Sequence, residues 1–70
     1  MDSELYSYSK YKGYHLYVEC TNYEDHEARY DGVAQLNGTT LFESLSYYSG
    51  DAAEGKLMEM IDEEWLEGAN

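Results

Sequence analysis

The sequence predicts an α+β fold, in which an antiparallel sheet of three strands, or of four, carries one C-terminal helix on one face. Three observations predict it: an Asn37-Gly38 turn between two strand-like segments, an alternating segment upstream of them, and helical periodicity after Gly50. Sheets with one dry and one wet face are usually antiparallel. Residues 1–70 are assigned to a single domain, because the chain has no proline, no low-complexity run and no internal repeat.

The central hairpin is the clearest local signal. Asn-Gly supplies the two positive-φ residues of a type I′ turn, so residues 27–36 and 39–48 are predicted to pair as strands. A two-residue loop fixes the register, which places Ala34 opposite Leu41 on the apolar face. Phe42 then lies on the opposite face, toward solvent.

Two further segments are predicted to join this hairpin. Residues 14–21 alternate between apolar and polar side chains, which predicts a third strand with Tyr17 on its wet side. Its core side carries Tyr14, Leu16, Val18 and Cys20. Residues 1–10 are predicted either as an edge strand, reached through a turn near Lys12-Gly13, or as a loose N-terminus of the kind common in serine-rich segments.

The segment 51–67 has the periodicity of an amphipathic helix. Asp51 is predicted to cap it, with Glu54 three residues later as in a capping box. The stripe that should face the core consists of Leu57, Met60, Ile61 and Trp65. The helix is therefore predicted to pack on the sheet.

The opposite side of the same helix carries a line of acidic residues. They are Glu59, Asp62, Glu63 and Glu67, spaced i, i+3, i+4 and i+8. Like charges four residues apart destabilise a helix by about 0.2–0.5 kcal/mol per pair, so helix stability alone would favour lysine at some of these positions. Salt screening makes this cost small, and a solubilising role is the alternative. We predict that the line binds a partner, with Glu54 adding to its charge.

The net charge indicates what kind of partner this is. Fifteen Asp and Glu residues stand against four Lys and Arg residues, which gives a formal net charge of −11. Direct binding of nucleic acid is disfavoured, because phosphates attract basic proteins and repel acidic ones. A field of this sign steers the protein toward cationic surfaces. We therefore expect the partner to be a basic nucleic-acid-binding protein or complex.

In size, charge and the acidic helix line, the chain resembles a class of very small, acidic, tyrosine-rich phage or plasmid proteins that mimic DNA. Proteins of this class block nucleases, restriction enzymes or CRISPR effectors, and the resemblance covers no specific motif. It implies an anti-CRISPR or anti-restriction type of inhibitor, acting in the cytoplasm of the host cell. Such an inhibitor would occupy the basic nucleic-acid channel of a host nuclease or defence complex.

The aromatic residues support an alternative function. Tyr17, Phe42 and Tyr48 are predicted to share the wet face of the sheet, and aromatic side chains often anchor protein interfaces. The protein would then be an acidic interaction module, which could be a homodimer, using this face or an edge strand. Tyrosine is also a good strand former, so a purely structural role is equally consistent with the pattern.

The sequence contains no pattern typical of catalysis or metal binding. Its two histidines, His15 and His26, belong to no assignable Ser-His-Asp arrangement, and no Gly-rich phosphate loop is present. The single cysteine cannot form an intrachain disulfide, and no Cys/His cluster has the spacing of a zinc site. No apolar stretch approaches the roughly 20 residues of a membrane span. We expect no enzymatic activity, no cofactor, no metal and no membrane contact.

Overall fold

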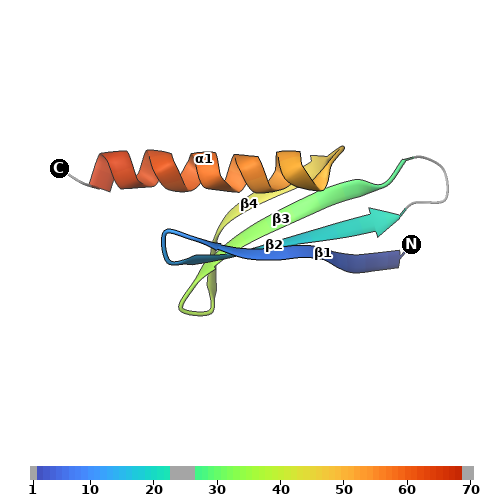
Figure 1. Cartoon of the computed structure of the whole chain (residues 1–70), viewed down its shortest axis with the longest axis horizontal. Coiled ribbons are helices and arrows are strands. Elements are labelled where there is room, and N and C mark those ends of the chain that lie inside the picture. Colours follow the sequence, from blue (N-terminus) through green and yellow to red (C-terminus); the bar gives the residue numbers. More distant parts are fainter. Residues whose placement is uncertain (1, 23–26, 69–70) are drawn as a thin grey trace.

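Four antiparallel strands and one C-terminal helix make up the fold. The computed structural model describes the backbone of residues 2–22 and 27–68 and the side chains of residues 3–22 and 27–64. The elements are, in order, β1 (Asp2–Tyr11), β2 (Tyr14–Asn22), β3 (Arg29–Leu36), β4 (Thr39–Tyr47) and α1 (Gly50–Gly68). The sheet is open, its strand order is β1-β2-β3-β4, and α1 lies along one face (Figure 1). The α+β fold is thus confirmed with four strands.

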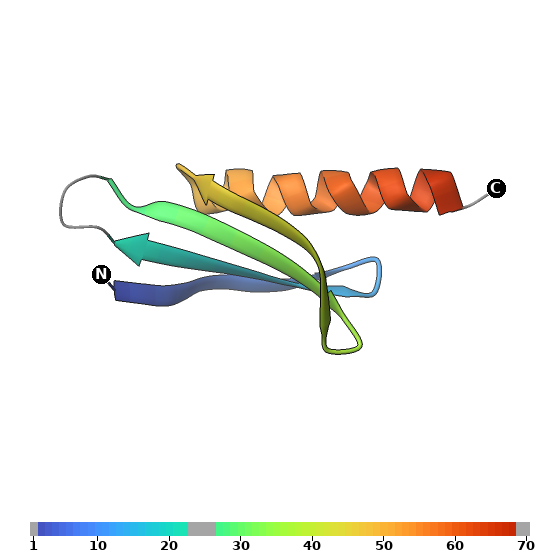
Figure 2. The same ribbon diagram turned by 180° about the vertical axis from the view of Figure 1, so that it is seen from behind.

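Two tight turns join the strands into hairpins. Asn37 and Gly38 have φ angles of 55° and 80°, as predicted for the turn between β3 and β4. Lys12 and Gly13, with φ angles of 49° and 87°, form a similar turn between β1 and β2. Glycine adopts such angles without steric cost, so both sequences favour a reversal of the chain. The view from behind shows both hairpins as parts of one sheet (Figure 2).

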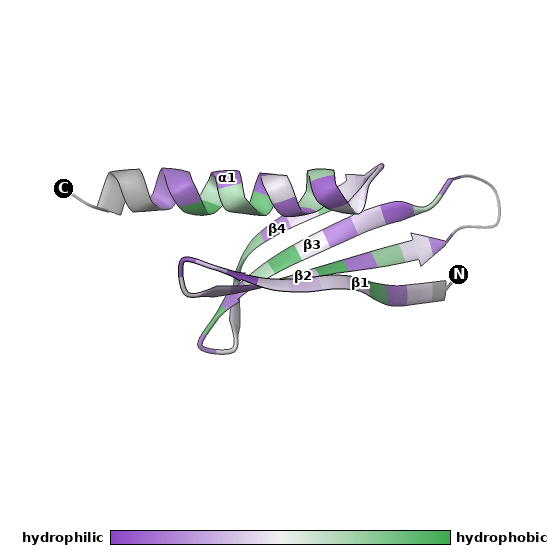
Figure 3. Ribbon diagram, viewed as in Figure 1, coloured by the Kyte–Doolittle hydropathy of each residue, from purple (hydrophilic) through white to green (hydrophobic). Residues whose placement is uncertain are grey.

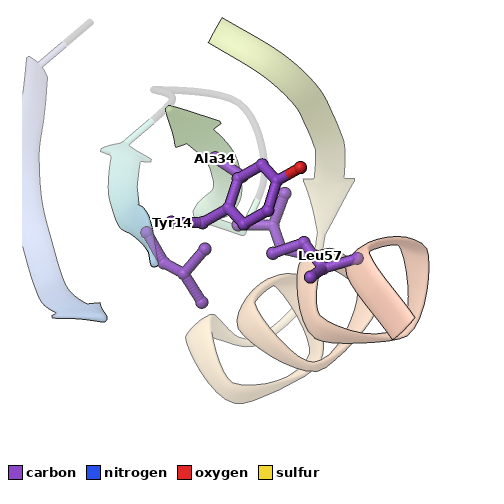
Figure 4. Close-up of a cluster of buried hydrophobic side chains, with 5 residues drawn as sticks. Tyr14, Ala34 and Leu57 are labelled. Carbon is purple, nitrogen blue, oxygen red and sulfur yellow. The ribbon is translucent and has the colours of Figure 1, made fainter. Parts of the chain in front are cut away.

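The hydrophobic core lies between the sheet and α1. Residues with no exposed surface are Leu16, Val18 and Ala34 of the sheet and Ala53, Leu57 and Ile61 of the helix. Tyr14, at the start of β2, packs in the same cluster as Ala34 and Leu57 (Figure 4). Positions 53, 57 and 61 are four residues apart and therefore share one side of the helix. Figure 3 shows hydrophobic segments, in green, on the side of α1 that faces the sheet.

The predicted helix stripe is partly confirmed. Leu57 and Ile61 are fully buried, whereas Met60 is only partly buried and packs at the margin of the cluster. The side chain of Trp65 lies outside the described residues. Ala53 was not predicted, and its small side chain lets α1 approach β4 closely, where its carbonyl accepts a 2.9 Å hydrogen bond from Ser44 Oγ.

The register of the central hairpin departs from the predicted one. Pairing agrees next to the turn, but a β-bulge follows, and Ala34 lies opposite Phe42 instead of Leu41. The extra residue turns Phe42 to the core side, where its ring centroid is 5.8 Å from that of Tyr14. Leu41 is 48% exposed. The prediction that Phe42 faces solvent is wrong, because a two-residue turn fixes the register only as far as the first bulge.

A second bulge interrupts β4 near its end. Pairing with β3 shifts between Tyr30 and Gly32, so Asp31 meets an irregular stretch of the partner strand. Ser46 in this stretch has a φ of 61°, and its backbone N–H donates a 2.7 Å hydrogen bond to Asp31 Oδ1. The edge formed by β4 is therefore less regular than an ideal strand.

The helix begins at Gly50, one residue before the predicted start. Ser49 is its N-cap, because Ser49 Oγ accepts a 3.1 Å hydrogen bond from the backbone N–H of Ala52. The prediction of Asp51 as the cap is wrong. Asp51 instead lies in the first turn, where a negative charge favours the helix N-terminus. A side chain at position 50 would collide with the ring of Tyr6 unless that ring moved, so glycine lets Tyr6 pack over the start of the helix.

Candidate binding surfaces

Some residues of the predicted acidic line are exposed in the structure, whereas Asp62 is bonded to the sheet. Glu59 and Glu63 are exposed on the side of α1 that points away from the sheet. Asp62 is half-buried and bonded to the first hairpin, and the side chain of Glu67 lies outside the described residues. Among the side chains of α1 that the structure describes, the exposed acids are Asp51, Glu59, Glu63 and Glu64, and we call them the acidic helix surface.

Asp62 connects α1 to the turn between β1 and β2. Its Oδ1 accepts a 2.8 Å hydrogen bond from the Tyr11 hydroxyl and lies 2.6 Å from Lys12 Nζ. The ammonium group and then the hydroxyl hold the pKa of Asp62 below its usual value. The same hydrogen bonds to the carboxylate raise the pKa of Tyr11 and of Lys12. Asp62 thus has a structural role, and its charge is partly neutralised by Lys12.

Glu54 makes a second contact between α1 and β1. Its Oε2 accepts a 3.1 Å hydrogen bond from Ser9 Oγ, and the side chain is partly buried. Glu54 and Asp62 are eight residues apart and lie on the flank of α1 that faces β1. The sequence singled out both as binding residues, and the structure places both against the protein's own sheet.

The acidic helix surface carries little compensating charge. Lys56 Nζ lies 3.6 Å from Glu59 Oε1, at the loose limit of an ion pair, and both side chains are exposed. Within residues 3–22 and 27–64, no ion pair involves Asp51, Glu63 or Glu64. Exposed pairs such as Lys56–Glu59 contribute little to stability and are readily exchanged. The surface can therefore bind a cationic partner at small cost.

The predicted aromatic patch does not form. Phe42 lies on the core face, whereas Tyr17 lies on the opposite face of the sheet, so the two cannot share a surface. Tyr48 is 70% exposed, and the guanidinium group of Arg29 lies 4.1 Å from the centroid of its ring. Tyr17 keeps its predicted position, but its aromatic neighbours are different ones.

The sheet face that α1 leaves uncovered carries another group of rings. Tyr8 lies opposite Tyr17 in the pairing of β1 with β2, and their ring centroids are 5.0 Å apart. The Tyr8 ring also stacks on His15, with ring centroids 5.9 Å apart, and the Tyr8 hydroxyl lies 2.6 Å from His15 Nδ1. Sequence reasoning missed this group because it left the pairing of β1 open. The alternation of β2, extended through a turn at Lys12-Gly13, would have placed Tyr8 beside Tyr17.

Comparison of the chain with protein-family models, curated protein sequences and solved structures gives no significant match at any of the three levels. Among the described residues, no group of three or more His, Cys, Asp and Glu side chains is arranged to hold a metal ion. The part of α1 that is described is not apolar enough to cross a membrane.

Proposed function

We propose that this chain is a small acidic inhibitor that acts by nucleic-acid mimicry. Its target would be the basic nucleic-acid-binding channel of a host nuclease or defence complex, as in anti-CRISPR or anti-restriction proteins of phages and mobile elements. The observation that carries the proposal is the acidic helix surface, whose exposed carboxylates have few cationic neighbours in the described structure. The protein itself would catalyse no reaction and would need no cofactor.

The shape of the molecule supports this proposal. It measures 47 by 19 by 15 Å along its principal axes, and the 19-residue helix is about 28 Å long at 1.5 Å per residue. Glu59 and Glu63 lie about 5–6 Å apart on one side of it. An elongated body with Glu59 and Glu63 on one side of its helix can lie lengthwise in a channel whose lysines and arginines are placed to meet phosphates.

The cost of the arrangement also supports a binding role. Glu59 and Glu63 are like charges at i and i+4, which destabilises the helix by about 0.2–0.5 kcal/mol. Glu63 and Glu64 lie just before the last turn of α1, where the helix dipole disfavours negative charge only weakly. Neither carboxylate forms an ion pair with a described residue. Their charge is therefore better explained by an external partner than by the stability of α1.

The experiment begins with capture of proteins from a host lysate on the tagged chain at low salt. Each captured protein is then tested for loss of binding to a fluorescent 20-bp duplex as the acidic chain is added. We expect the chain to displace the duplex, and Glu59→Lys/Glu63→Lys to displace it much less. The single variants Glu63→Lys and Glu4→Lys form a matched pair, because each reverses one exposed glutamate.

The single variant Glu63→Lys is informative because it should not unfold the protein. A lysine at position 63 would stand four residues after Glu59, where opposite charges stabilise a helix. Displacement should also weaken as salt is added. If Glu63→Lys and Glu4→Lys displace the duplex equally well, the acidic helix surface is not the contact and nucleic-acid mimicry by α1 is excluded.

A second candidate function is an acidic protein-interaction module that uses the sheet instead of the helix. The observation that favours it is the uncovered sheet face, where Leu5 is 60% and Tyr8 46% exposed. β1 also has an unpaired edge, since it stands first in the strand order. Binding of this kind should depend on Tyr8 and Tyr17. Sedimentation of the pure chain would detect a homodimer.

A further inference from the structure

We propose that the uncovered face of the sheet binds arginine side chains of a partner protein. The rings of Tyr8 and Tyr17 would form the stacking platform, and Glu19, Asp31 and Glu43 would supply the opposing charge. This inference rests on the second candidate function and is independent of nucleic-acid mimicry by α1.

The register of the sheet brings the platform together. Tyr8 of β1, Tyr17 of β2 and Val33 of β3 lie directly opposite one another in a row across three strands. Directly opposite side chains share a face, and the buried residues on either side of them, such as Leu16 and Val18, point to the helix. The row therefore points away from α1. Val33 supplies an aliphatic floor beside the two rings.

The acids surround this row on two sides. Glu43 lies opposite Val33 and continues the row into β4. Glu19 and Asp31 lie opposite each other in the adjacent row, together with Leu5. Glu19 accepts a 3.1 Å hydrogen bond from Ser3 Oγ and Asp31 a 2.7 Å hydrogen bond from the Ser46 N–H, but within the described part of the chain none of the three carboxylates forms an ion pair. Three carboxylates beside an aromatic pair, of which Tyr8 is exposed and Tyr17 partly buried, favour a ligand that is both cationic and flat.

Arginine meets both requirements and lysine meets only one. Its guanidinium group is planar, stacks on aromatic rings and can form two hydrogen bonds to one carboxylate, whereas an ammonium group is a compact point charge. The protein already contains one such contact, because the guanidinium group of Arg29 lies 4.1 Å from the centre of the Tyr48 ring. Tyr8 contacts His15 and Tyr17, but it is 46% exposed, and an external arginine would stack on this exposed part of the ring.

The remaining charged residues make one end of this sheet face acidic and the other end basic. Lys10 lies opposite His15 in the row on the far side of Tyr8, so the face is acidic toward Glu19 and basic toward the first hairpin turn. Arg29, two positions from Asp31 on β3, already contacts Tyr48. A bound arginine is therefore expected to approach from the Glu19 side of the rings.

A second copy of this chain would not fit the face as well. Two copies meeting there would oppose six carboxylates from Glu19, Asp31 and Glu43. The chain has four Lys and Arg residues in all, of which Lys12 and Lys56 pair with acids of α1. With a net charge of −11, association of identical chains is also opposed at long range. A basic partner relieves both repulsions.

The test compares two peptides of equal charge, hexa-arginine and hexa-lysine, by NMR titration of the ¹⁵N-labelled full chain. We expect hexa-arginine to bind about two- to fivefold more tightly, with the largest shifts at Tyr8, Tyr17 and Glu19. Tyr8→Ala/Tyr17→Ala should abolish the preference for arginine. Tyr8→Phe/Tyr17→Phe keeps both rings and should retain it, which separates stacking from loss of fold.

Two outcomes would overturn the proposal in distinguishable ways. Equal affinity for the two peptides, with shifts still at Tyr8 and Tyr17, would exclude selectivity for arginine but leave the sheet face as a binding surface. Shifts confined to α1 would exclude the sheet face itself. Glu59→Lys/Glu63→Lys should lower both affinities through net charge and leave their ratio unchanged, whatever the outcome for nucleic-acid mimicry.

Discussion

Tyr11 donates a 2.8 Å hydrogen bond to Asp62, and this contact joins the first hairpin to the helix across 51 residues of chain. Lys12 reaches the same carboxylate oxygen at 2.6 Å. The Asp62 side chain therefore contacts both the last residue of β1, Tyr11, and the first residue of the turn, Lys12. The first hairpin is attached to α1 through this group in addition to its pairing with the rest of the sheet.

Replacement of Asp62 should change how stability depends on pH. Because the pKa of Asp62 is lowered in the folded protein, its contribution is complete above about pH 4 and is lost as pH falls through the lowered value. We expect Asp62→Asn to be less stable than the parent at pH 7 and to approach it at the lowest pH. Urea unfolding at several pH values measures this difference.

Glu63→Gln is the matched control for this prediction, since it removes an adjacent carboxylate that forms no ion pair with the described residues. This variant should not lose stability at pH 7. The raised pKa values of Tyr11 and Lys12 make the free energy of unfolding depend on pH in the opposite sense. Their contribution is present below about pH 10 and is lost as pH rises through the raised values.

The observed register predicts different costs for two neighbouring residues of β4. Phe42 packs against the core cluster, so Phe42→Ala should lower the free energy of unfolding by about 2–4 kcal/mol. Leu41 is 48% exposed, and Leu41→Ala should cost less than about 1 kcal/mol. Chemical denaturation of the two variants measures both values. A larger cost for Leu41→Ala than for Phe42→Ala would mean that the bulge opposite Ala34 and Gln35 does not form.

Gly32 should tolerate no larger side chain. A Cβ atom there would lie 2.7 Å from Ser44 Oγ and 2.8 Å from Leu57 Cδ1, closer than such atoms normally approach. We expect Gly32→Ala to destabilise the protein by about 1–3 kcal/mol through overpacking. Gly55→Ala is the control: a Cβ atom there meets nothing within 4 Å, and alanine should stabilise the helix by about 1 kcal/mol. Thermal unfolding distinguishes the two.

Loss of the N-cap should cost more than loss of the neighbouring charge. Ser49→Ala removes the acceptor for the Ala52 N–H and should lower stability by about 0.5–2 kcal/mol. Asp51→Ala removes a favourable charge worth about 0.3–1 kcal/mol, which the higher helix propensity of alanine partly offsets. Helix content and the urea midpoint report both effects. A larger loss for Asp51→Ala would identify Asp51 as the cap.

The parts of the fold that depend on local sequence were predictable. Asn37-Gly38 identifies its hairpin because few other dipeptides adopt two positive φ angles, and the spacing of Leu57 and Ile61 identifies the buried side of α1. The N-terminal strand could only be offered as one of two alternatives. Its pairing depends on Tyr11 and Tyr14 facing each other, which becomes visible only when the turn at Lys12 and Gly13 is taken as certain.

The corrections arise from interactions between distant residues. The bulge beside Ala34 brings Phe42 under the helix, and no local pattern specifies where a strand gains an extra residue. Asp62 has the helical spacing of an exposed acid, but Tyr11 and Lys12 lie within reach once the hairpin has folded. Asp62 left the candidate binding site for the same reason. Its position along the helix predicts the direction of its side chain but does not predict which strand residue it contacts.

Each strand of this sheet pairs with the strand next to it in the chain, and α1 follows directly after β4. Most backbone pairings therefore close short loops, which have a low entropic cost and are typical of proteins that fold quickly. Formation of the sheet requires no long-range crossover connection. The chain is expected to fold rapidly as it leaves the ribosome, so that newly synthesised molecules are soon able to bind.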